Sequence, residues 1–165
     1  MKGSVDRGLA SVAVRLGRRL AAAGHTLTTA ESCTGGWISK AVTDVSGSSQ
    51  WFNEGFVTYS NDSKHERLGV PMSVLRKHGA VSEATARAMA AGALRRAHAD
   101  VAVAVTGIAG PGGGVPGKPV GTVWLAWARR IGRGIQVSAQ LRHFRGNRDA
   151  VRHKTVRAAL LGLMR

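Results

Sequence analysis

An uninterrupted apolar run at residues 101–105 (VAVAV) is the feature that most limits how this chain can fold. A strand with one solvated face alternates apolar and polar residues, whereas a strand buried on both faces reads as a continuous apolar run. We therefore predict a central strand over residues 100–106, covered by helices on both sides. A glycine-rich loop, which extends to residue 114, follows this strand directly.

The remaining segments supply strands and helices in alternation. Helical spacing of apolar residues predicts a first helix over residues 4–23, with Gly24 at its end. Further strands are predicted at residues 26–30, 52–59, 120–128 and 135–144, and further helices at residues 35–44, 64–68, 72–78, 82–98 and 148–164. The last two strands would form an antiparallel pair. This order indicates a three-layer α/β/α domain with a mixed, mostly parallel sheet, and the length favours one domain over residues 1–165.

The composition limits which binding partners and which cellular compartment we expect for this chain. The chain has 24 Lys and Arg residues against 9 Asp and Glu, a formal charge of +15. Such a surface attracts phosphorylated small molecules or, non-specifically, nucleic acid, although an arginine-rich composition also reflects a GC-rich coding bias. Cys33 is the only cysteine, so no internal disulfide is possible. The first helix is amphipathic and unlike a signal peptide or membrane span, so we expect a cytoplasmic protein without membrane contact.

A small-residue stretch from Thr28 to Gly36 joins a predicted strand to a predicted helix. Backbone N–H groups at a helix start can hold a phosphate. They can also stabilise the oxyanion that forms when a serine attacks an acyl group. Alternatively, Ser32 and Thr34 only cap the helix. The sequence leaves these alternatives open.

Ser32 needs a base if it is a nucleophile. The chain has six histidines, but no Gly-x-Ser-x-Gly elbow surrounds Ser32, and a Ser-Lys pair is the other option. Lys64 follows the strand that ends at Tyr59, although its place on a short polar helix favours a solvated position.

Cys33 is expected to point into the core as a small hydrophobe. No metal-ligand spacing occurs, so we expect no metal site.

Two of the predicted strands end in glycine-rich loops, the first at Ser32 and the central one at Thr106. Ligands of open α/β sheets bind at the carboxyl ends of the strands. We therefore expect one site built from both loops. Thr106 would hydrogen-bond either a ligand there or its own loop.

Seven stretches carry a resemblance to a known family. They are residues 30–36 (AESCTGG), 47–49 (GSS), 57–61 (VTYSN) followed by Lys64, 68–70 (LGV), 79–82 (GAVS), 104–113 (AVTGIAGPGG) and 118–123 (KPVGTV). In this order they resemble the CinA C-terminal domain, the nicotinamide-nucleotide amidohydrolase family. The resemblance covers nearly the whole chain, which makes it far more specific than a single glycine loop. Ser46 stands where proline is common in the family, and Asn147 where aspartate is.

The resemblance implies hydrolysis of nicotinamide mononucleotide to nicotinic acid mononucleotide and ammonia, in pyridine nucleotide recycling and without a metal or organic cofactor. Ser32 would be the nucleophile and Lys64 the base, assisted by Tyr59 and Thr106. The implied substrate-binding residues are Thr34, Gly35, Gly36, Ser49, Gly107, Gly110, Gly112 and Arg148.

The alternative function is a catalytically silent nucleotide- or nucleic-acid-binding module linked to competence or DNA damage. The joint presence of Ser32, Tyr59, Lys64 and Thr106 favours the enzyme. For either function we expect a homo-oligomer.

Overall fold

Five strands form one sheet in the order β2-β1-β3-β4-β5 in the computed structural model, which describes residues 2–165, with side chains from residue 8 onward. The strands are β1 (Leu27–Glu31), β2 (Phe52–Val57), β3 (Val101–Gly107), β4 (Thr122–Ile131) and β5 (Gly134–His143). Strand β1 pairs in parallel with β2 and β3, whereas β4 pairs antiparallel with β3 and β5. Only β4 therefore runs against the other described strands, and the predicted mixed, mostly parallel sheet is confirmed.

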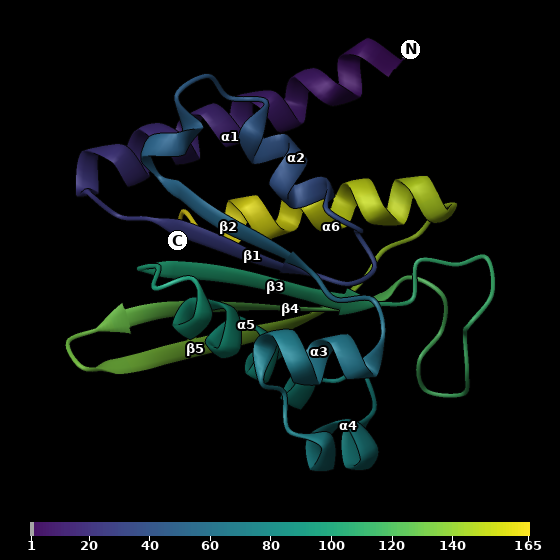
Figure 1. Ribbon diagram of the computed structural model, residues 1–165. Coiled ribbons are helices and arrows are strands. Elements are labelled where there is room, and N and C mark those ends of the chain that lie inside the picture. The colour runs from purple at the N-terminus through teal and green to yellow at the C-terminus, as the bar shows by residue number, and fades with distance from the viewer. Residues whose placement is uncertain (1) are drawn as a thin grey trace.

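The helices cover both faces of this sheet (Figure 1). One face carries α1 (Lys2–Ala23), α2 (Trp37–Thr43) and α6 (Arg148–Gly162). The other carries α3 (Asn61–Leu68), α4 (Met72–His78) and α5 (Glu83–Arg96). A short 3₁₀ helix, Ser48–Gln50, precedes β2. The predicted three-layer α/β/α architecture is confirmed.

Strand β3 is buried on both faces, as its apolar run predicts. Its valines belong to the core under α1, α2 and α6, and its alanines to the core under α5. The small side chains on the second face let α5 lie close to the sheet. Helix α5 also packs closely against α3 on its other side. An added Cβ at Gly92 of α5 would overlap the backbone carbonyl of Leu68. Gly92 thereby allows α3 to pack tightly on α5.

The predicted boundaries differ from the observed ones mainly at turns. Strand β4 extends to Ile131 because the β4–β5 turn consists of only Gly132 and Arg133. Strand β2 stops at Val57 because Ser60 begins α3, with its side chain accepting a hydrogen bond from the Ser63 N–H. The predicted cap of α5 is confirmed, since the Ser82 hydroxyl accepts a hydrogen bond from the Thr85 N–H at 3.2 Å.

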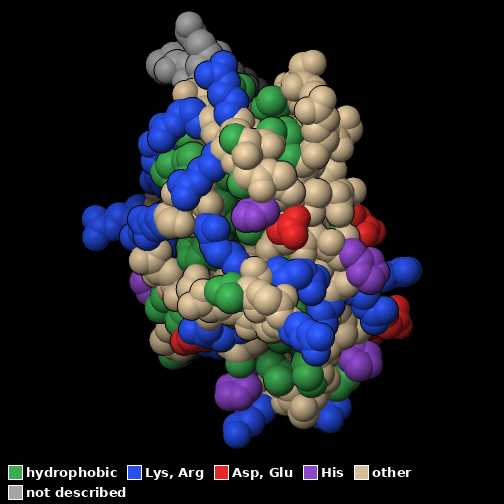
Figure 2. Space-filling model, turned by 90° about the vertical axis from the view of Figure 1, so that its left-hand side faces the viewer, with side chains coloured by type: hydrophobic (Ala, Val, Ile, Leu, Met, Phe, Trp, Pro, Cys, Tyr) green, Lys and Arg blue, Asp and Glu red, His purple; other side chains and the backbone are tan. Residues whose placement is uncertain are grey.

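Basic side chains spread widely over the surface. Figure 2 views the side on which the β4–β5 turn lies, and Lys and Arg side chains there greatly outnumber acidic ones. Within residues 2–165, no helix combines the length and hydrophobicity that a bilayer crossing requires. The positive charge therefore covers a surface well beyond the carboxyl ends of the parallel strands.

Candidate active site

Three parallel strands end at one edge of the sheet, and their following loops meet there. Glu31, the last residue of β1, pairs with Val57 of β2 and Val105 of β3. Ser32 comes directly after Glu31, Tyr59 follows β2, and Thr106 lies at the end of β3. The edge that the sequence predicts for a ligand thus carries these three side chains.

Lys64 of α3 reaches Ser32 from the layer containing α5. Its Nζ lies 3.1 Å from Ser32 Oγ, 2.8 Å from the Thr58 carbonyl oxygen and 3.4 Å from the Tyr59 carbonyl oxygen. The Lys64 side chain is only 1% exposed, so the solvated position predicted from spacing is wrong. Leu68, four residues later on the same helix face, is also buried, and this spacing was the available signal that Lys64 faces inward.

The surroundings of Lys64 favour a neutral amine. Burial lowers the pKa of Lys64 below its usual value, because a charged ammonium loses hydration there. No carboxylate forms an ion pair with Lys64 among the described side chains. An amine with a lowered pKa beside a serine hydroxyl is the arrangement that a Ser-Lys pair requires.

The start of α2 is not a free anion site. Glu31 is fully buried, and its carboxylate accepts hydrogen bonds from the backbone N–H groups of Gly36, Ile38 and Ser39 at 2.8–3.1 Å. It also accepts hydrogen bonds from the hydroxyls of Thr34, at 2.6 Å, and Ser39, at 2.9 Å. The expected binding of a phosphate or oxyanion by the N–H groups at Gly36 is therefore wrong, because an internal carboxylate occupies that position.

Two other N–H groups of this turn donate to backbone carbonyls. The Gly35 N–H donates to the Ser32 carbonyl at 3.1 Å, and the Trp37 N–H donates to the Thr34 carbonyl at 3.2 Å. The N–H groups of Cys33 and Thr34, in contrast, have no hydrogen-bond acceptor among the described residues. Capping by Ser32 is also wrong, since Gly36 is the N-cap of α2 and Glu31 supplies the capping oxygens.

Cys33 lies in the core, as predicted. It is 5% exposed and packs in the cluster under α1, α2 and α6. Burial raises the pKa of the Cys33 thiol to about 12. A thiol with so high a pKa carries almost no thiolate at neutral pH, so it is a poor nucleophile.

Arg148 joins two segments at the mouth of the site. Its Nη1 donates to the Gly110 carbonyl at 2.7 Å, and its Nη2 donates to the Tyr59 hydroxyl at 3.1 Å. The Tyr59 side chain is 63% exposed. Tyr59, Gly110 and Arg148 thus form a polar cluster that solvent or a ligand can reach.

The structure also places four further residues that were predicted for the site, namely Thr106, Gly107, Gly112 and Ser49. The Thr106 hydroxyl is buried and donates to the Ala80 carbonyl at 2.8 Å. A Cβ at Gly107 would come within 2.7 Å of the Thr122 carbonyl, so close strand packing explains that glycine. Gly112 is exposed on the loop after β3. Ser49 precedes β2, at the amino end of the strand, so this chain does not bring it to Ser32.

Histidines do not take part in the Ser32 contact. Among the described side chains, no histidine hydrogen-bonds to Ser32. His65 contacts the Val70 carbonyl at 2.9 Å, and His143 contacts Thr122 at 3.3 Å. The described residues also contain no cluster of three His, Cys, Asp or Glu side chains suited to a metal ion.

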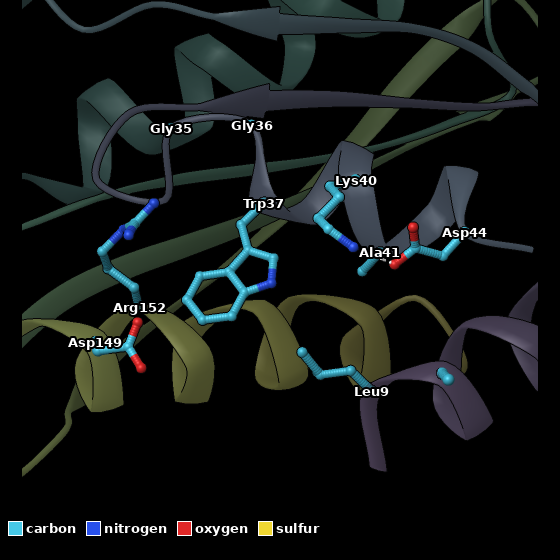
Figure 3. Close-up of a pocket in the computed structure, with 10 residues that line it drawn as sticks. Leu9, Gly35, Gly36, Trp37, Lys40, Ala41, Asp44, Asp149 and Arg152 are labelled. Atoms are coloured by element: carbon cyan, nitrogen blue, oxygen red, sulfur yellow. Dashed lines mark hydrogen bonds and ion pairs between the residues drawn. The ribbon is translucent and has the colours of Figure 1, made fainter. Parts of the chain in front are cut away.

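A cavity of about 710 Å³ lies beside the Gly35–Gly36 turn (Figure 3). It is lined by α1, α2 and α6, and neither Ser32 nor Lys64 faces it. Trp37 and Arg152 stand against its wall, with the Arg152 guanidinium carbon 5.2 Å from the Trp37 ring centroid. The cavity therefore borders the nucleophile turn without containing the Ser32–Lys64 contact.

Residues 9–165 match the family described as the CinA C-terminal domain. The chain belongs to this family. It is 52% identical over 155 residues to "Nicotinamide-nucleotide amidohydrolase PncC" of Escherichia coli K12, covering 94% of this chain and 92% of that protein. It is also 52% identical over 156 residues to the Pseudomonas putida protein of the same name, covering 94% of this chain and 95% of that protein.

A solved structure and a further relative are also similar to this chain. The crystal structure of the competence/damage inducible protein CihA from Agrobacterium tumefaciens superposes with a TM-score of 0.89 at 46% identity, covering 95% of this chain and 94% of that chain. A "CinA-like protein" of Akkermansia muciniphila is 55% identical over 136 residues, which are 82% of this chain but 32% of that protein. The α/β fold predicted from the order of strands and helices is also that of a solved structure from this family.

Proposed function

We propose that this chain hydrolyses the carboxamide of nicotinamide mononucleotide, giving nicotinic acid mononucleotide and ammonia. The observation that carries the proposal is the 3.1 Å contact between the buried Lys64 amine and the Ser32 hydroxyl. It occurs in a chain that is 52% identical to proteins named for this activity. A binding module without catalysis would gain nothing from burying an amine that has no carboxylate partner among the described side chains.

In the proposed reaction, Lys64 acts as the base in its neutral form. Two N–H bonds of the amine then donate to the carbonyls of Thr58 and Tyr59, and the nitrogen lone pair accepts the Ser32 proton. Ser32 Oγ bonds to the carboxamide carbon, and the C=O electron pair moves onto the oxygen. When that pair returns, the C–N bond breaks and the Lys64 ammonium protonates the leaving nitrogen, which departs as ammonia.

The second half of the reaction releases the acid. Lys64, now neutral again, takes a proton from water as the water attacks the acyl-serine carbon. The C–Oγ bond then breaks, and the Ser32 oxygen recovers a proton from Lys64. The net reaction consumes one water and requires no oxidant, reductant or further co-reactant.

The transient oxyanion and the permanent charge of the substrate phosphate need different partners. The Thr34 N–H, which has no acceptor among the described residues, would donate to the oxyanion. The substrate phosphate would bind at the cluster of Tyr59, Gly110 and Arg148, where the guanidinium is held beside the glycine-rich loop. Thr106 would act through the Ala80 segment that it holds in place.

The roles proposed for Ser49 and for a homo-oligomer belong together. Because Ser49 lies at the far end of β2 from Tyr59, it would reach substrate only through another copy of the chain. The oligomeric state therefore stays a prediction, which light scattering on the purified protein tests. The cytoplasmic location likewise stays a prediction.

The activity itself is tested by ammonia release from nicotinamide mononucleotide, followed together with the appearance of nicotinic acid mononucleotide. We expect turnover by the parent protein and none by Ser32→Ala. Equal ammonia release by both proteins, or a parent protein that binds the nucleotide without hydrolysing it, would contradict the proposal.

A further inference from the structure

Arg152 of α6 donates hydrogen bonds to the turn that follows Ser32. Its Nε donates to the Cys33 carbonyl at 3.2 Å, and its Nη2 donates to the Thr34 carbonyl at 2.8 Å. The guanidinium also stacks on Trp37, and Figure 3 shows it extending from α6 toward the turn. One side chain thus fixes two successive carbonyl groups of the turn.

Fixing a carbonyl also fixes the N–H of the same peptide group. In a trans peptide the C=O and the following N–H point in opposite directions, and the described residues have a cis peptide only at Gly110–Pro111. The Thr34–Gly35 peptide shows the result directly. Its carbonyl accepts from Arg152, and its N–H, on the opposite side, donates to the Ser32 carbonyl at 3.1 Å.

The same reasoning applied to the Cys33–Thr34 peptide orients the Thr34 N–H, which has no acceptor among the described residues. Arg152 approaches from the layer of α1, α2 and α6, whereas Lys64 approaches Ser32 from the layer of α3 and α5. Because the Cys33 carbonyl points to Arg152, the Thr34 N–H points away from α6.

We propose that Arg152 is a positioning residue, which holds the Cys33–Thr34 peptide so that the Thr34 N–H faces the oxyanion formed at Ser32. This inference rests on the proposed acyl-transfer function. Only arginine suits the position, because a planar guanidinium can donate to two carbonyls at once and stack on an indole ring. A lysine would keep the charge without this fork.

A donor that acts on the oxyanion stabilises the transition state more than the bound substrate. Loss of Arg152 should therefore lower kcat and leave KM nearly unchanged. Removal of one oxyanion donor costs about 10²–10³-fold in kcat, and a donor that is only misoriented should cost less. We expect a loss of roughly 10–100-fold in Arg152→Met.

The experiment compares Arg152→Met and Arg152→Lys with the parent protein. Arg157→Met is the matched control, since Arg157 is an exposed arginine on the same helix. With nicotinamide mononucleotide, we expect both Arg152 variants to lose kcat with KM within about threefold of the parent, while Arg157→Met retains its kcat. An unchanged kcat in Arg152→Met, or a rise in KM that accounts for the whole loss, would overturn the inference.

A second measurement separates this inference from the choice of substrate. A fluorophosphonate probe bonds to an activated serine as the P–F bond breaks and fluoride leaves, and its phosphoryl oxygen uses the same donor as an oxyanion. We expect labelling of Ser32 to be at least tenfold slower in Arg152→Met than in the parent or in Arg157→Met. If the parent is labelled but does not hydrolyse the nucleotide, the proposed substrate is wrong and the labelling rates still decide the role of Arg152. Equal labelling rates, or no labelling of the parent, would overturn that role.

Discussion

The Nζ of Lys64 and the Oγ of Ser32 lie 3.1 Å apart, although 32 positions separate the two residues in the chain. Two backbone carbonyls, of Thr58 and Tyr59, also accept hydrogen bonds from the amine. These contacts fix the amine against the hydroxyl but supply no full negative charge to hold a proton on it. The site therefore combines precise placement with a lowered pKa, the two properties that a lysine base needs.

The choice of nucleophile is tested by two neighbouring substitutions. Ser32→Ala should abolish amide hydrolysis and leave the fold intact, because it removes one hydroxyl at the edge of the sheet. Cys33→Ala should retain most of the activity, since the thiol is buried in the core and has a pKa of about 12. Ammonia release and thermal unfolding of both variants check this. Loss of activity in Cys33→Ala alone, with normal stability, would identify the thiol as the nucleophile.

Burial of Lys64 should cost stability, so Lys64→Met should unfold at a higher temperature than the parent at pH 7. The pKa of Lys64 is lower in the folded than in the unfolded protein. Between these two values the unfolded chain binds more protons, and the stability of the parent therefore rises with pH. The advantage of Lys64→Met should be largest below the folded pKa and shrink as the pH approaches about 10.4, the unfolded value.

Thermal unfolding of the two proteins across this pH range checks the prediction. A stabilisation of about 1 kcal/mol corresponds to roughly 2–4 °C in Tm for a chain of this size. A lower Tm for Lys64→Met, with the same pH dependence as the parent, would mean that the amine stabilises the fold.

The position of Lys64 shows what sequence patterns miss. The pattern correctly predicts a short helix that carries Lys64 and ends at Gly69. The predicted cap at residues 61–63 is wrong, because Ser60 is the N-cap and these three residues form the first turn of the helix. The pattern does not predict that Gly92 lets this helix approach α5 closely, or that the strand ends place Ser32 opposite. Those relationships depend on contacts between distant segments. The sequence offers only the i, i+4 spacing of Lys64 and Leu68 as a signal, and the tertiary structure shows that Lys64 is buried.

Glu31 should be essential for the shape of the nucleophile turn. Glu31→Gln replaces an acceptor oxygen with an NH₂ group that faces N–H donors, and it removes the charge that complements the start of α2. We expect a loss of roughly 2–4 kcal/mol in the free energy of unfolding, from weakened charge-assisted hydrogen bonds and unpaired donors. Glu54→Gln, at an exposed position, is the control. Urea unfolding of the two variants checks this, and equal stabilities would contradict it.

The same residue decides between the alternatives that the sequence leaves open for the start of α2. A glycine pair before a helix is compatible with an external anion, with an oxyanion and with simple capping. The deciding group is the Glu31 carboxylate, which folds back over the turn and accepts hydrogen bonds from Gly36, Ile38 and Ser39. An acidic residue at the end of a buried strand, shortly before a helix, was the available signal.

Arg148 should act on the substrate phosphate and leave the chemical step alone. Arg148→Met removes the guanidinium that lies between Tyr59 and Gly110. We expect KM for nicotinamide mononucleotide to rise about tenfold or more, since a hydrogen bond to a charged group contributes about 1.5–3 kcal/mol. The values for nicotinamide riboside, which lacks the phosphate, should change little. Steady-state kinetics with both substrates check this, and an equal loss on both would place Arg148 in the chemical step.

The pH–rate profile of Lys64→Arg against the parent tests the central claim most directly. An unperturbed lysine would be only about 0.04% neutral at pH 7, whereas burial lowers the pKa of Lys64 and raises that fraction. With nicotinamide mononucleotide, we expect the parent rate to rise with pH along a basic limb whose midpoint lies below 10.4. Lys64→Arg keeps the charge but cannot release its proton, so it should lose this limb and about 10²–10⁴-fold in rate. Turnover by Lys64→Arg near the parent rate, with the same basic limb, would show that Lys64 supplies only charge and that another group removes the Ser32 proton.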